Sequence, residues 1–269
     1  MNVCELINDG AGAIIEELAN NEIVYNEFRR GTAWNHCHNA FKEANQALSD
    51  GDSVNYDDLA KDLTIYLANW GMYRGSSFLI WLDYKFHIDA VEMMMEEKYK
   101  ALFNANNPFS LPKYKELLFD YKKGIYVRLN RYYHDAHQDV RKQQFEQGMV
   151  QSTYGGQAES DTLITKILLG VYGCIPAYDT YVKKGLSLFG AQQSLNEKGI
   201  AVFGDGVKRK SLSALLYGTT LASEIEFYRK KHSDYTFMKL ADMFFFELGE
   251  LAEKEDKAQI KEAIEAKYF

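Results

Sequence analysis

The sequence predicts an all-α protein with two helical lobes and a cleft between them. Only 3 of its 269 residues are proline, and its 19 glycines are dispersed, which favours long helices over strands and turns. Apolar residues recur at helical spacing along most of the chain. The length allows a large core, in one domain or in two lobes that share an interface.

The first part of the chain contains four predicted helical segments: residues 12–30, residues 34–48, a helix capped by Asp57 or Asp58, and the long apolar stretch 78–103. The segment 104–112 (NANNPFSLP) predicts a loop. We therefore expect an N-terminal helical region, residues 1–110, and a second helical region, residues 111–269, that carries the chemistry. The two lobes can also interleave as one globular unit.

Basic residues are concentrated in the middle of the chain, although the formal net charge is −7. One basic cluster lies within residues 121–142 and a second within residues 183–210, whereas both ends of the chain are acidic. This distribution can focus a polyanion such as nucleic acid onto one face. A solvated surface of mixed charge is the alternative that these counts leave equally open.

The composition also indicates the cellular compartment and bears on whether the protein binds a metal or another cofactor. No stretch approaches the roughly 18 uncharged apolar residues of a membrane span, and the start, MNVCELINDGAG, does not resemble a secretory signal. Three cysteines are too few for a disulfide framework or a four-thiolate cluster, so we expect the reducing cytoplasm. His134 and His137 share a helical face but lack an identifiable third ligand, and we expect neither a metal nor another cofactor.

The stretch from residue 161 to residue 186 combines helix caps, a chain reversal and an acid. Ser160 or Asp161 can cap the first helix, and Gly173 is expected to end it. Pro176 then forces the chain to reverse before a second helix begins at or just after Asp179. A carboxylate there lies at the positive end of a helix, which favours its charged form. Asp179 is therefore either an N-cap alone or a functional acid.

A second unusual stretch follows the predicted third helix. Residues 69–77 (NWGMYRGSS) place aromatic, basic and small polar groups around two glycines, which allow close approach of a ligand. Trp70 or Tyr73 could stack on a base, with Arg74 reaching a phosphate. A kinked buried helix is the alternative.

A family resemblance is carried by two short runs, Tyr172-Gly173-Cys174-Ile175-Pro176 and Tyr178-Asp179-Thr180-Tyr181-Val182-Lys183-Lys184. They resemble the helix-hairpin-helix superfamily of DNA glycosylases, the endonuclease III-like fold. In that family a helix ends in an aromatic-Gly-x-Pro-like turn, followed by an apolar residue and Asp-Thr-His-Val with basic residues. The resemblance covers residues 162–186 only. The hairpin of the family corresponds here to a degenerate Gly155-Gly156-Gln157-Ala158, and the iron-sulfur cysteines of some members are absent.

The resemblance implies that double-stranded DNA is the partner and that the enzyme flips out a damaged or modified base and hydrolyses its N-glycosidic bond. Asp179 would be the catalytic carboxylate. The lysine of bifunctional members corresponds to about Thr162, and Lys166 lies one turn further in, which implies a monofunctional enzyme. The candidates for the base pocket or wedge are Trp70, Tyr73, Arg74 and Tyr178. The candidates for the DNA backbone are Lys183, Lys184, Arg128 and Arg131. Divergence from the family favours an unusual base, such as those of phage DNA, in defence or in repair.

Two other functions fit parts of the sequence. A metal-independent, HEPN-like ribonuclease would use an arginine and a histidine at the spacing of Arg128 and His134, or of Arg30 and His36. The residue after Arg128 is the apolar Leu129, where such sites have a polar residue. A non-enzymatic helical interaction module would use the abundant aromatic residues for packing alone.

Overall fold

The computed structural model describes residues 3–21, 32–104, 113–152, 159–195, 211–232 and 234–269. Within these ranges the protein is all-helical and contains no β-strand, as the sequence predicts. None of the described helices is both long and apolar enough to cross a membrane.

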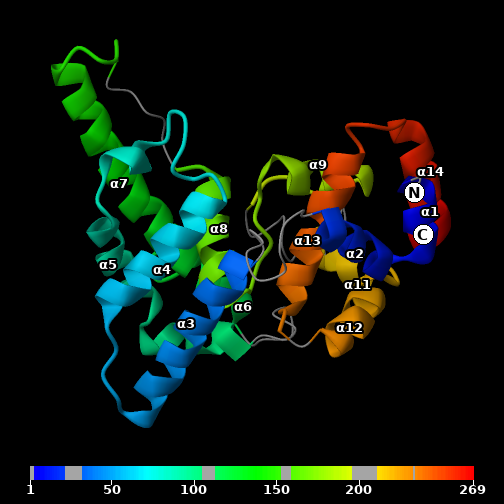
Figure 1. Cartoon of the computed structure of the whole chain (residues 1–269), viewed down its shortest axis with the longest axis horizontal. Helices are drawn as coiled ribbons and strands as arrows, with labels where there is room; N and C mark the ends of the chain where they lie inside the picture. The colour runs from blue at the N-terminus through cyan, green and yellow to red at the C-terminus, as the bar shows by residue number, and fades with distance from the viewer. Residues whose placement is uncertain (1–2, 22–31, 105–112, 153–158, 196–210, 233) are drawn as a thin grey trace.

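One group of helices occupies the left of Figure 1 and comes from the middle of the chain. Its members are α3 (Thr32–Asp50), α4 (Tyr56–Asn69), η2 (Phe78–Trp81), η3 (Tyr84–His87), α5 (Ile88–Met94), η4 (Glu97–Asn104), α6 (Tyr114–Phe119), α7 (Ile125–Glu146) and α8 (Asp161–Tyr172). α8 is its central helix, because it packs against α3, α4, α7 and η4.

The second group joins the two ends of the chain (Figure 1). It contains α1 (Val3–Asp9), α2 (Ala11–Asn21), α9 (Thr180–Leu188), α11 (Leu212–Tyr217), α12 (Leu221–Lys231), α13 (Phe237–Leu251) and α14 (Lys257–Tyr268). α1 packs on α14, and α2 packs on α12 and α13. The division of the chain at residue 110 stays a prediction, as do the lobes and the cleft.

α9 and α13 are held together by close backbone contact. A Cβ atom at Gly185 would overlap the carbonyl oxygen of Phe245, and one at Gly249 would overlap the carbonyl oxygen of Tyr181. Only glycine therefore allows the two helices to approach so closely. This contact fixes the first turn of α9 against α13.

One local prediction about the first part of the chain is wrong, and a second is confirmed in outline. Residues 78–103 are helical as predicted, but Leu82 is extended and the segment is divided into η2, η3, α5 and η4. The cap of α4 is Asn55, whose side chain accepts from the Asp57 amide, and Asp57 and Asp58 lie in the first turn. The predicted loop at residues 104–112 lies outside the described residues from residue 105 onward.

Candidate functional site

The turn between α8 and α9 is built by local capping. The Ser160 hydroxyl accepts a hydrogen bond from the Leu163 amide at 3.3 Å and caps the start of α8. Gly173 ends α8 in the left-handed region, with φ of 60°. Its carbonyl oxygen accepts from the Thr236 hydroxyl at 2.8 Å, which ties the turn to the start of α13. The predicted caps at Ser160 and Gly173 are confirmed.

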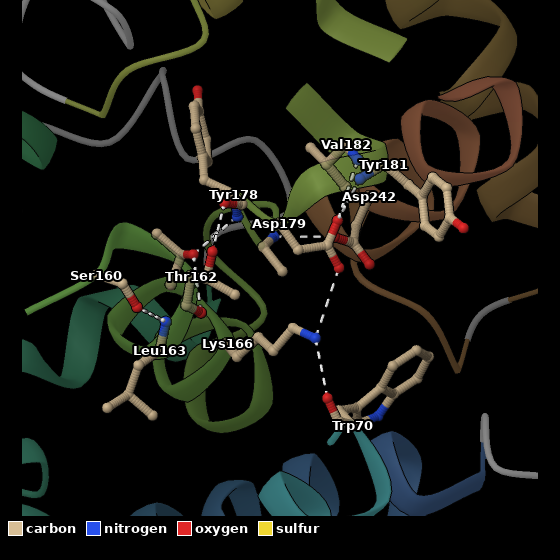
Figure 2. A network of polar contacts seen from close by, with 12 residues as sticks. Trp70, Ser160, Thr162, Leu163, Lys166, Tyr178, Asp179, Tyr181, Val182 and Asp242 are labelled. Atoms are coloured by element: carbon tan, nitrogen blue, oxygen red, sulfur yellow. Dashed lines mark hydrogen bonds and ion pairs between the residues drawn. The ribbon is translucent and has the colours of Figure 1, made fainter. Parts of the chain in front are cut away.

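Side chains from α8 and α13 then hold the segment that leads to Asp179. The Tyr178 amide donates to the Thr165 hydroxyl at 2.8 Å, and the Tyr178 carbonyl accepts from Thr162 at 2.9 Å. The Ala177 amide donates to Oδ1 of Asp242 at 2.8 Å. Figure 2 shows these bonds on both sides of the segment. The backbone before Asp179 is thus fixed from two helices.

Asp179 is the N-cap of α9. Its Oδ1 accepts from the amides of Tyr181 and Val182, each at 3.1 Å. Its Oδ2 lies 3.5 Å from Nζ of Lys166, which also donates to the Trp70 carbonyl oxygen at 3.1 Å (Figure 2). The Asp179 and Lys166 side chains are only 14% and 8% exposed, so little solvent screens their attraction. One carboxylate oxygen serves the cap, and the other faces a cation.

A second charged pair, Lys239 and Asp242, lies beside the first and comes from α13. Lys239 Nζ is 3.3 Å from Oδ2 of Asp242, and both side chains are buried. The ammonium groups of Lys166 and Lys239 lie 5.6 and 5.1 Å from the ring centre of Trp70, which permits cation–π attraction. The site therefore combines two ammonium groups, two carboxyl groups and an indole.

Burial opposes charge on two of these groups. Desolvation raises the pKa of Asp242 above its ordinary value, although Lys239 and the Ala177 amide favour its charged form. Desolvation also lowers the pKa of Lys166, and the neighbouring carboxylates of Asp179 and Asp242 oppose that change. Because burial and neighbouring charges act in opposite directions on both groups, the site has the electrostatic character of many functional sites.

These charged groups line a small pocket, which we call the Asp179 pocket. The remaining lining residues are Leu18, Tyr66, Leu169, Ala177, Met243 and Phe246. The space among the side chains admits about one water molecule. The pocket therefore combines a fixed carboxylate, room for a water and a largely apolar wall.

Three candidates for the base pocket lie outside the Asp179 pocket. The Tyr73 hydroxyl lies 2.5 Å from Nε2 of the buried His87. Tyr178 is fully buried and is positioned through its backbone. Arg74 lines a neighbouring groove. The structure thus brings Trp70 and Asp179 together, and it places Tyr73, Tyr178 and Arg74 elsewhere.

The candidates for the DNA backbone are scattered. Arg128 donates to Glu96 at 2.6 Å and to the Tyr99 hydroxyl at 3.1 Å, and Lys184 pairs with Glu253. Both are engaged within the protein. Arg131 is exposed on α7, and Lys183 is half-buried on α9. The second basic cluster continues into residues 198–210, which lie outside the described ranges. Residues 155–158, the degenerate counterpart of the family's hairpin, also lie outside them.

The arginine and histidine of the ribonuclease alternative contact different neighbours. The Arg128 guanidinium is held by Glu96, whereas Nδ1 of His134 lies 3.9 Å from Glu159. Arg30, the arginine of the other such pair, lies outside the described residues.

Sequence reasoning did not assign three residues to the site, namely Lys166, Lys239 and Asp242. Lys166 interrupts the apolar run ITKILLGV, and Lys239 and Asp242 are three positions apart in the apolar stretch FMKLADMFFF. Charged residues on the buried face of an apolar helix are rare unless they are paired. That pattern was the available indication of a polar cluster.

Comparisons of this chain with protein-family models, with curated proteins and with solved structures find no match.

Proposed function

We propose that the protein is a monofunctional DNA glycosylase, which hydrolyses the N-glycosidic bond of a damaged or modified base. The observation that carries this proposal is the environment of Asp179. Its carboxylate is fixed by two backbone amides, is shielded from solvent and lies in a pocket with room for water. A fixed carboxylate stabilises the positive charge that develops on the sugar as the bond breaks.

The reaction needs few groups. The bond between C1′ and the base nitrogen breaks, and its electron pair leaves with the base, which takes up a proton from the solvent. Asp179 stabilises the resulting cation through its Oδ2 side. A water molecule then attacks C1′, and Asp179 accepts the proton that this water loses. The products are the free base and an abasic sugar.

Lys166 fits the role of charge partner better than that of nucleophile. A nucleophilic amine needs a free lone pair, but Nζ of Lys166 donates to the Trp70 carbonyl oxygen and faces Asp179. An ammonium group in this position keeps the Asp179 carboxylate oriented toward the pocket. The proposal is therefore hydrolysis without a covalent intermediate.

A base requires more space than the Asp179 pocket provides. Leu18, Met243 and Phe246 form part of its wall, and these side chains extend from α2 and α13. Methionine and leucine change rotamer readily, so rotation of Leu18 and Met243 would enlarge the pocket without moving a helix. The proposal requires such an opening when the substrate binds.

The direct test is incubation of the purified protein with duplexes that each carry one damaged or modified base. The panel should include alkylated, oxidised and deaminated bases and the modified pyrimidines of phage DNA. Hot alkali then converts each abasic site into a strand break. Breaks at one class of base support the proposal. Intact strands across the whole panel, with RNA cleaved instead, would favour the ribonuclease alternative.

A further inference from the structure

A groove of about 760 Å³, with polar and apolar groups in its lining, lies beside the Asp179 pocket. One wall is the loop after α4, from Gly71 to Leu79, and the other is formed by His137 on α7 and by residues 159–163 at the start of α8. Residues that line the groove adjoin residues that line the pocket at two places in the chain. Gly71 lines the groove, and the preceding Trp70 lines the pocket. Leu163 lines the groove, and Lys166, one turn later on α8, lines the pocket.

Arg74 lies at the first of these two places. A Cβ atom built on Gly71 would lie 2.7 Å from Nε and 2.8 Å from Cζ of Arg74, so the guanidinium rests directly against the Gly71 backbone. Gly71 also has φ of 75°, which disfavours any other residue. The Arg74 side chain lines an open groove. Within the described ranges, no acidic side chain pairs with it. The Arg74 guanidinium thus lies against the Gly71 backbone, and its charge is available to a ligand.

The opposite wall is also ordered and polar. Nδ1 of His137 lies 2.7 Å from Oε1 of Glu159, and the His137 ring stacks on Phe78 with the ring centres 4.6 Å apart. The Glu159 side chain is only 8% exposed, so the acid of this groove is largely covered and engaged by the histidine. The first amides of α8, a helix of 12 residues, add partial positive charge at the same end.

We propose that this groove binds a phosphodiester of the nucleic-acid strand next to the nucleotide that enters the Asp179 pocket, with Arg74 as the phosphate ligand. A guanidinium matches the geometry of a phosphate with two parallel hydrogen bonds. The groove is large enough for a nucleotide unit, and a free inorganic anion would fill little of it. The location of the strand rests on the proposed function, whereas phosphate binding by the groove does not.

The test measures the binding of an unmodified 20-base-pair duplex and of one of its strands, by fluorescence anisotropy over a series of salt concentrations. Arg74→Ala should weaken binding by roughly 10-fold near 100 mM salt and should reduce the salt slope by about 1. Arg74→Lys keeps the charge and should recover part of the affinity. Lys257→Ala, which removes an exposed charge from α14 at the far end of the molecule (Figure 1), is the matched control and should leave the slope unchanged.

A second variant separates position from charge. Gly71→Ala would displace the Arg74 guanidinium without changing the net charge, so it should weaken binding in the same direction as Arg74→Ala. Circular dichroism and urea unfolding confirm that each variant is folded. Binding by Arg74→Ala with the affinity and the salt slope of the natural protein would overturn the proposal, as would the absence of duplex and strand binding by the natural protein.

The outcome is distinct from that for the proposed function. Arg74-dependent binding without base release from any substrate would support the groove and contradict the glycosylase. Base release that depends on Asp179 but keeps the same KM in Arg74→Ala would support the glycosylase and contradict the groove.

Discussion

Nζ of Lys166 lies between Oδ2 of Asp179, at 3.5 Å, and the carbonyl oxygen of Trp70, at 3.1 Å. The three residues come from α8, from the N-cap of α9 and from the end of α4, so one ammonium group links three segments. Because the site is buried, this attraction is stronger than that of an ion pair in water. The pair both stabilises the packing of the two helix groups and sets the charge that faces the Asp179 pocket.

Replacement of Lys166 by methionine should therefore affect both stability and activity. The substitution nearly preserves volume but leaves Asp179 near Asp242 without its cation. We expect the free energy of unfolding to fall by about 1–3 kcal/mol, because Asp179 keeps its two amide donors. We expect base release to fall by at least roughly 10-fold, a loss of about 1.4 kcal/mol in transition-state stabilisation. Urea unfolding and single-turnover kinetics measure the two effects.

The matched control is Lys142→Met, which alters an exposed lysine on α7 and should change stability by less than about 0.5 kcal/mol. Borohydride reduction during the reaction provides an independent check. The hydrolytic mechanism predicts no covalent product between protein and DNA. A trapped product that disappears in Lys166→Met would instead identify Lys166 as a nucleophile and contradict the monofunctional proposal.

The contact between α9 and α13 predicts a strong effect at Gly185. Its φ is in the ordinary range, but an alanine methyl group would overlap the Phe245 carbonyl oxygen. Gly185→Ala should therefore cost about 3 kcal/mol or more, because backbone must move. Gly75→Ala is the contrasting variant. It has φ of 62° with no atom within 4 Å of the new methyl group, and it should cost only about 1 kcal/mol. Equal losses in urea unfolding would contradict the backbone-contact explanation.

Stability should decrease in mildly acidic solution because two histidines are buried. Burial lowers the pKa of His38 to about 4 and that of His87 to about 4, from an ordinary value of 6.5. The unfolded chain therefore binds more protons than the folded chain between these values, and stability falls as the pH falls from about 6.5 to about 4. The loss amounts to at most about 3 kcal/mol for each histidine.

Urea unfolding at about pH 7 and about pH 5 measures this dependence. His87→Gln removes one titrating group while leaving an amide that can bond to the hydroxyls of Tyr73 and Tyr133, which His87 contacts at 2.5 and 2.6 Å. The variant should show a shallower loss over this range. A pH dependence identical to that of the natural protein would show that His87 does not contribute.

The caps of α8 and α9 were predictable because their causes are local. Ser160, Gly173 and Asp179 act within one turn of their own backbone, so residue type and spacing are sufficient. The region of residues 78–103 was not predictable in this way. Apolar spacing there fits a long helix, but the chain instead forms two 3₁₀ turns capped by Ser77 and Asp83 before α5 begins.

Of the candidate site, only Asp179 and the turn that carries it could be predicted from the sequence. Asp179 stands out through its own turn, whereas Lys239 and Asp242 reach it from α13, more than fifty positions away in the chain. No local pattern specifies which helix packs beside the turn. Tyr73 and Tyr178 show the opposite error. Each lies close in sequence to a glycine or an acid, but its side chain packs within the protein and does not line the Asp179 pocket.

In the proposed reaction the charge of Asp179 performs the chemistry, and one substitution removes that charge alone. Asp179→Asn keeps an oxygen for the Tyr181 and Val182 amides and removes only the charge, so the cap should persist. Asp256→Asn is the matched control, because the Asp256 carboxylate also caps a helix, α14, through the Ala258 amide at an exposed position. On a duplex whose base the natural protein releases, we predict that Asp179→Asn forms abasic sites at least 100-fold more slowly. This is roughly the lower end of the rate loss when an enzyme loses one group that stabilises charge in its transition state. DNA binding and folding should be retained, and Asp256→Asn should react normally. Base release by folded Asp179→Asn at the natural rate would show that the Asp179 charge does not perform the chemistry.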